Sequence, residues 1–71
     1  MTLDAKTKEL IAIGASITAH CQPCLTYHLE KAREAGVSDE EVRDAIAVGH
    51  QVEKGSMSIM REFSAEITGK K

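Results

Sequence analysis

The feature that most constrains the fold is a series of apolar residues at helical spacing along the C-terminal half of the chain. It recurs every three or four positions from Val42 to Ile67 and keeps its phase through Gly55. This spacing is typical of one face of a helix. We therefore predict one long helix, with Gly55 as the position where it could kink. The apolar stripe comprises Val42, Ile46, Gly49, Val52 or Glu53, Ser56 or Met57, Met60, Phe63 and Ile67.

This stripe is longer than two short helices of the same chain can cover. The chain has 71 residues, 42% of them hydrophobic, but Tyr27 and Phe63 are its only aromatic residues. Chains of this size often obtain missing burial from partner subunits. We therefore expect a homo-oligomer, in which Met57 and Met60 lie in the core or interface rather than in a ligand pocket.

The residues before the stripe predict two shorter helices. The first runs from Leu3 to about Thr18, with Thr2 or Asp4 as its N-cap. Its inward face comprises Leu3, Leu10, Ile13 and Ile17.

A corner over residues 19–22 leads into the second helix. Pro23 fits the first helical turn, where a missing N–H costs nothing. This helix runs to Ala35 and stops at Gly36, which suits a left-handed C-terminal position. Its inward face comprises Leu25, His28, Leu29 and Ala32.

Ser38 and Glu41 have the spacing of a capping box, which predicts the start of the long helix. Strand-like alternation is absent from the sequence. The expected fold is all-α: an antiparallel helical hairpin plus a long third helix, in a single domain of residues 1–71, completed by oligomerisation.

Charge and hydropathy exclude several classes of partner. Nine Lys and Arg against eleven Asp and Glu give a net charge of −2. The Lys70-Lys71 pair is too short for a nucleic-acid arm and is predicted to be a solvated tail. No apolar stretch is long enough for a membrane span and no signal peptide precedes the first helix, so we expect a cytoplasmic protein without nucleic-acid or membrane partners.

Cys21, Cys24 and His28 are the residues that carry chemistry. In a reducing compartment a C-x-x-C pair is more often catalytic or metal-binding than structural. Both thiols lie near the positive end of the second helix, which favours thiolate. His28 follows Cys24 by one turn on the same face, so its imidazole can accept the thiol proton. Proximity to His28 favours Cys24 as the nucleophile, whereas exposure at the helix tip favours Cys21.

Two alternatives remain open at this stage. Cys21, Cys24 and His28 could instead bind zinc, with His20, His50 or Glu9 as a fourth ligand, although a second ligand pair is absent. The chain could also be a helical assembly module with incidental cysteines. His20 could lower the pKa of Cys21, and His50 could approach the site from a neighbouring segment or subunit.

Glu9, Cys21, Cys24 and His28 reproduce the spacing E-x11-C-x2-C-x3-H. This pattern, with the stretch from His28 to Ala32 and the Ala35-to-Ser38 turn, resembles the alkylhydroperoxidase D branch of the carboxymuconolactone decarboxylase superfamily. The resemblance covers about residues 3–55. It implies an all-α fold, assembly into trimers or hexamers, and thiol peroxidase or disulfide oxidoreductase activity without a cofactor.

The same resemblance implies roles for the four residues. Cys24 is the attacking thiolate, Cys21 is the resolving cysteine, and His28 with Glu9 forms a proton relay. The implied substrate is a small hydroperoxide or a disulfide, and the implied reductant is a thioredoxin-like or lipoyl protein. Gln22-Pro23 stands between the cysteines where better-known members carry a His, a difference expected to lower peroxidase activity more than dithiol chemistry.

Overall fold

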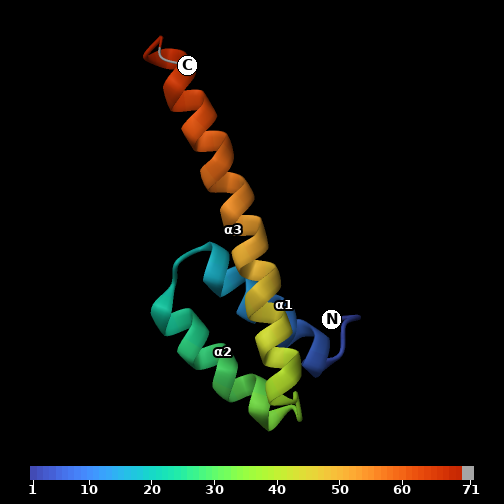
Figure 1. Ribbon diagram of the computed structural model, residues 1–71. Coiled ribbons are helices and arrows are strands. Elements are labelled where there is room, and N and C mark those ends of the chain that lie inside the picture. The colour runs from blue at the N-terminus through green and yellow to red at the C-terminus, as the bar shows by residue number, and fades with distance from the viewer. Residues whose placement is uncertain (70–71) are drawn as a thin grey trace.

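The computed structural model describes residues 1–69, and this part of the chain consists of helices and turns without strands. Three helices follow one another: α1 (Ala5–Thr18), α2 (Gln22–Glu34) and α3 (Asp39–Ile67). Figure 1 shows α1 and α2 side by side at one end of the much longer α3. The predicted all-α fold is therefore confirmed, whereas the predicted Lys70-Lys71 tail lies outside the described residues.

Helix α1 begins two residues later than its apolar pattern predicts. The Asp4 carboxylate accepts the N–H of Thr7 at 2.8 Å, which makes Asp4 the N-cap and Ala5 the first helical residue. Leu3 therefore precedes the helix and is 47% exposed. Its predicted place on the inward face is wrong, because a capping hydrogen bond fixes the helix start more locally than apolar spacing does.

The corner and α2 follow the prediction closely. Residue His20 adopts a left-handed conformation with φ 56°, and Cys21 is the N-cap of α2 with proline in the first turn. The helix ends with Ala35 as its C-cap, followed by Gly36 at φ 86°. A glycine accepts this conformation without the steric cost of a Cβ.

Helix α3 starts at the predicted capping box. The Glu41 N–H donates to Ser38 Oγ at 3.1 Å, and the Ser38 N–H donates to Glu41 Oε1 at 2.9 Å. From there α3 runs for 29 residues, through Gly55, as one uninterrupted helix.

Helix α1 lies between the other two and contacts both of them. The buried apolar core consists of Ile13, Ala32, Val37 and Val42. The predicted inward face of α2 packs around this core, since Leu25 and Leu29 contact it and Ala32 belongs to it.

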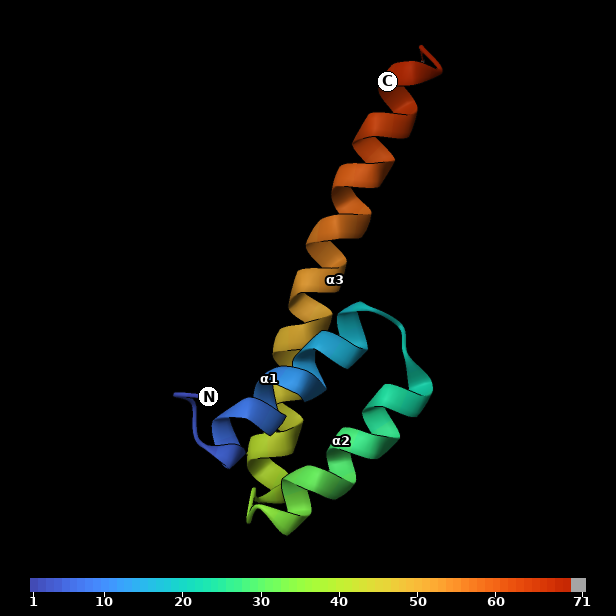
Figure 2. The same ribbon diagram turned by 180° about the vertical axis from the view of Figure 1, so that it is seen from behind.

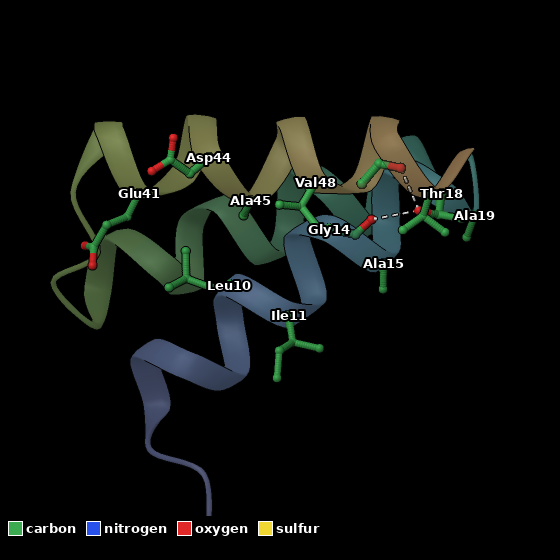
Figure 3. A pocket seen from close by; sticks show the side chains of 12 residues that line it. Leu10, Ile11, Gly14, Ala15, Thr18, Ala19, Glu41, Asp44, Ala45 and Val48 are labelled. Carbon is green, nitrogen blue, oxygen red and sulfur yellow. Dashed lines mark hydrogen bonds between the residues drawn. The ribbon is translucent and has the colours of Figure 1, made fainter. Parts of the chain in front are cut away.

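Helices α1 and α3 approach most closely at two glycines. A Cβ added to Gly49 would lie 2.6 Å from the Gly14 carbonyl oxygen and 2.8 Å from the Ile17 Cβ. The Thr18 hydroxyl donates to the Gly49 carbonyl oxygen at 2.9 Å (Figure 3). Glycine at position 49 therefore permits this crossing, because any side chain there would overlap α1.

The C-terminal part of α3 extends away from the packed helices, as Figures 1 and 2 show from opposite sides. The described chain measures 51 × 24 × 22 Å as a result. Val42 and Gly49 of the predicted stripe are buried and Ile46 is half-buried. Beyond Gly55, the stripe residues Met57, Met60, Phe63 and Ile67 are 47–67% exposed.

An apolar groove of about 820 Å³ runs along α1 and the first half of α3 (Figure 3). The largest apolar residues that line the groove are Leu10, Ile11, Val48 and Val52. Its acidic lining residues are Glu41 and Asp44, near the start of α3. None of the described helices combines the length and apolar composition that a membrane span needs.

Candidate functional site

Cys21 and Cys24 are joined by a disulfide at the start of α2. Their Cα atoms lie 5.2 Å apart, within the range that a disulfide spans without backbone movement. Cys21 is the N-cap and Cys24 is the third residue of the helix. The pair therefore lies where unpaired N–H groups stabilise negative charge on a sulfur.

The two sulfurs differ in their surroundings. The N–H of Cys24 donates to Cys21 Sγ at 3.3 Å, so Cys21 uses its sulfur as the helix cap. Cys24 is exposed, whereas Cys21 is half-buried. The expectation that the helix tip exposes Cys21 more than Cys24 is therefore wrong, because the capping conformation turns Cys21 back onto the helix.

Glu9 of α1 and His28 of α2, which the resemblance implies to be a proton relay, are in contact. His28 Nδ1 lies 2.7 Å from Glu9 Oε1, and Lys8 Nζ lies 3.7 Å from Glu9 Oε2. Glu9 is 5% exposed, and the His28 side chain is 29% exposed. The Glu9 carboxylate is therefore buried between α1 and α2, whereas the His28 imidazole is partly exposed to solvent.

This contact lowers the pKa of Glu9 and fixes the tautomer of the His28 imidazole. The hydrogen bond from His28 lowers the pKa of Glu9 against the opposing effect of burial, with further lowering from the charge of His28 and from Lys8. An ionised carboxylate only accepts hydrogen bonds, so Nδ1 of His28 carries the hydrogen. In the neutral imidazole, Nε2 is then the basic nitrogen, available to take and return a proton.

His28 occupies the same helix face as Cys24, one turn later. Among residues 1–69, no hydrogen bond joins His28 to either sulfur. The disulfide itself has no thiol proton to share, so a contact between imidazole and thiol belongs to the reduced state.

His20 and His50 both contact Glu53, a residue that the sequence analysis does not single out as a candidate. His20 Nε2 contacts Glu53 Oε2, and His50 Nδ1 lies 2.9 Å from Glu53 Oε1. The i, i+3 spacing of His50 and Glu53 predicts one of these two contacts, that between His50 and Glu53. The contact with His20 depends on how α1 crosses α3.

The zinc alternative requires several donor side chains around one point. Within residues 1–69, no group of three or more His, Cys, Asp or Glu side chains is arranged to hold a metal ion. Cys21 and Cys24 are instead bonded to each other.

Comparison with known proteins gives a family match over most of the chain. The model of the "Carboxymuconolactone decarboxylase family" matches residues 2–56. This segment contains α1, α2, the first half of α3 and all the candidate site residues.

Two curated relatives are similar over shorter stretches. "Uncharacterized protein 4 in cox locus" of Paracoccus denitrificans is 33% identical over 54 residues, which are 76% of this chain and 49% of that protein. An "Uncharacterized protein" of Haemophilus influenzae is 50% identical over 30 residues, 42% of this chain and 26% of that protein. The chain thus spans at most about half the length of these relatives. No solved structure matches it.

Proposed function

The chain belongs to the carboxymuconolactone decarboxylase family, and from this premise we propose that it is a thiol-dependent redox enzyme of the alkylhydroperoxidase D-like branch. The observation that supports the proposal best is the Cys21–Cys24 disulfide at the N-terminus of α2, beside the buried Glu9–His28 pair. A dithiol at a helix N-terminus with an adjacent base has the parts of an activated sulfur nucleophile.

In the proposed reaction, Cys24 is the attacking residue because it is the more exposed of the two cysteines and shares a helix face with His28. Nε2 of His28 takes the Cys24 thiol proton. The thiolate attacks the terminal oxygen of a hydroperoxide, the O–O bond breaks, and the proton passes to the leaving alkoxide. Cys24 becomes a sulfenic acid, and the hydroperoxide leaves as an alcohol.

Cys21 then resolves the sulfenic acid. Its sulfur attacks Cys24 Sγ, the S–O bond breaks, and water leaves as the disulfide forms. Two thiols of a reductant, which we propose to be a thioredoxin-like or lipoyl protein, restore the dithiol and leave as a disulfide. Glu9 acts through His28, since its carboxylate fixes the tautomer and the orientation of the imidazole.

Counting free thiols before and after one equivalent of hydroperoxide tests this function. We expect two thiols per reduced chain to fall to none, and a Cys24→Ser variant to lose the rapid reaction. A Cys21→Ser variant should react once and stop at the sulfenic acid, which a sulfenic-acid trap detects. Two thiols that remain free, in a chain that purifies with near-stoichiometric zinc, would favour the metal-binding alternative.

We also propose that the protein works as a homo-oligomer. On α3, Val48 and Val52 of the apolar groove share a helix face with the exposed Ile59 and Phe63, and Met57 and Met60 widen the exposed apolar surface. Isolated monomers rarely expose continuous apolar surface of this extent. A second copy supplies the same surface, so the two can pair by symmetry.

Light scattering coupled to size-exclusion chromatography tests the assembly. We expect a mass of several chains, with a trimer or hexamer as the family resemblance implies. A Met60→Ser, Phe63→Ser double variant should shift the mass towards the monomer. A wild-type chain that stays monomeric at every concentration would contradict the proposal.

A further inference from the structure

A second cluster of imidazole and carboxylate groups lies outside the Glu9–His28 pair. Glu53 of α3 accepts from His20 in the corner and from His50 on its own helix. Its carboxylate is 23% exposed, whereas the side chains of His20 and His50 are 67% and 59% exposed. The left-handed backbone of His20, with φ 56°, is an uncommon conformation for a residue with a side chain.

This cluster borders a small cavity next to Cys21. The cavity has a volume of about 150 Å³ and lies where the corner, α1, α2 and α3 meet. Its ionisable lining groups are His20, Cys21 and His50, whereas the lining residues from α1 and α2 do not titrate. The complete lining is Ser16, Ile17, His20, Cys21, Gln22, Leu25 and His50.

Reduction of the disulfide requires one proton for each sulfur. A thiolate of the reductant attacks the exposed Cys24 sulfur, a mixed disulfide forms, and Cys21 leaves as a thiolate. A second thiolate attacks the mixed disulfide, the reductant leaves as its own disulfide, and Cys24 leaves as a thiolate. The two protons that the reductant thiols give up must reach Cys21 and Cys24.

Of the two proton transfers, the position of His28 suits only the one to Cys24. It follows Cys24 by one turn and lies on the α1 side of α2, bonded to Glu9. The cavity that borders Cys21 is instead lined by His20 and His50. Cys24 therefore shares a helix face with one imidazole–carboxylate pair, whereas Cys21 lines a cavity with the two imidazoles of the other cluster.

We propose that His20, His50 and Glu53 form a second proton relay, which serves Cys21 as the Glu9–His28 pair serves Cys24. This inference rests on the proposed dithiol chemistry and adds the source of the second proton. His20 is the residue adjacent to Cys21 and exchanges the proton with its sulfur. Glu53 and His50 are positioning residues, because they act through His20.

The surroundings of Glu53 suit this role. Its hydrogen bond from His50 lowers the pKa of Glu53, burial opposes this, and His20 lowers it further. An ionised Glu53 only accepts, so it holds the hydrogen of His20 on Nε2 and leaves Nδ1 as the basic nitrogen. When His20 carries the proton, its positive charge favours a Cys21 thiolate next to it.

The test follows each thiolate separately by its absorbance at 240 nm as a function of pH. The Cys24→Ser variant reports Cys21 alone, and the Cys21→Ser variant reports Cys24 alone. Adding Glu53→Gln should raise the titration midpoint of Cys21 by about one pH unit, a tenfold change in the ionisation constant, and leave that of Cys24 in place. Adding Glu9→Gln should instead raise the titration midpoint of Cys24 and leave that of Cys21 in place.

Glu62→Gln, on the projecting part of α3, is the matched control and should move neither midpoint. His20→Gln and His50→Gln replace exposed side chains, so they provide folded alternatives to Glu53→Gln and should move the Cys21 midpoint in the same direction. An unchanged Cys21 midpoint in all three variants would overturn the proposal, as would equal shifts for both cysteines. Failure of the peroxide reaction would leave these titrations unaffected, so the two proposals fail separately.

Discussion

The packed part of the chain, residues 1–53, and the projecting end of α3, residues 54–67, contain similar apolar residues in different surroundings. The packed part contains the buried core, both imidazole–carboxylate clusters and the disulfide. The projecting end carries large apolar side chains that remain 47–70% exposed: Met57, Ile59, Met60, Phe63 and Ile67. Apolar spacing therefore determines where α3 is helical, whereas packing against α1 determines which of its apolar side chains are buried.

The largest expected difference between the two parts is the effect of removing an isoleucine side chain. Ile13 is fully buried and Ile59 is 70% exposed. Ile13→Ala should therefore cost about 2–5 kcal/mol of unfolding free energy, whereas Ile59→Ala should change it by about 0.5 kcal/mol or less. Urea unfolding followed by circular dichroism, at low protein concentration, measures both. Similar losses would mean that the projecting end is as well covered as the core.

A glycine in each part offers a second comparison, with smaller effects. A Cβ at Gly49 would overlap α1, so Gly49→Ala should cost about 1–3 kcal/mol of stability. The same unfolding experiment applies, and a neutral result would show that the two helices separate readily at this crossing.

Gly55→Ala should increase the stability of the protein, whereas Gly49→Ala should decrease it. Among the described residues, apart from the chain neighbours of Gly55 and the backbone of its own helix, no atom lies within 4 Å of a Cβ built at this position. Alanine loses less conformational freedom than glycine in a helix, so the variant should be about 0.5–1 kcal/mol more stable. A destabilised Gly55→Ala protein would indicate that something else, such as a second copy, packs closely at this position.

The smallest expected effect on stability is that of Glu9 in the packed part, and it depends on pH only in the acid range. The pKa of Glu9 is lowered in the fold, chiefly by His28. Its contribution to stability is therefore complete above the ordinary glutamate pKa of about 4.3 and is lost as the pH falls through the lower value in the fold. Unfolding free energies measured between pH 7 and pH 2 should decrease less steeply in Glu9→Gln than in the wild type. Identical slopes would show that the His28 contact does not persist in solution.

Local signals made much of the fold predictable. Ser38 with Glu41, Gly36 and Pro23 act through hydrogen bonds and backbone angles within a few residues, so the sequence indicates them directly. Leu3 was misplaced because the Asp4 cap, rather than apolar spacing, determines where α1 begins.

Long-range contacts were less predictable. The C-x-x-C-x-x-x-H pattern by itself indicates three candidate site residues, whereas Glu9 is identified only through the family resemblance. Glu53 was missed because its contact with His20 arises from the α1–α3 crossing at Gly49. Such a crossing depends on three-dimensional packing that apolar spacing does not encode.

The sulfur cap of α2 couples the oxidation state to the order of a helix. In the disulfide, the Cys24 N–H donates to a neutral Cys21 sulfur. In the reduced protein, above the pH at which the Cys21 thiol ionises, the same donor meets a thiolate, which is a stronger acceptor. We therefore expect amide hydrogen exchange in the first turn of α2 to slow on reduction, opposite to the usual loosening when a disulfide opens. Because this contact stabilises the dithiol form, it also makes the disulfide a stronger oxidant.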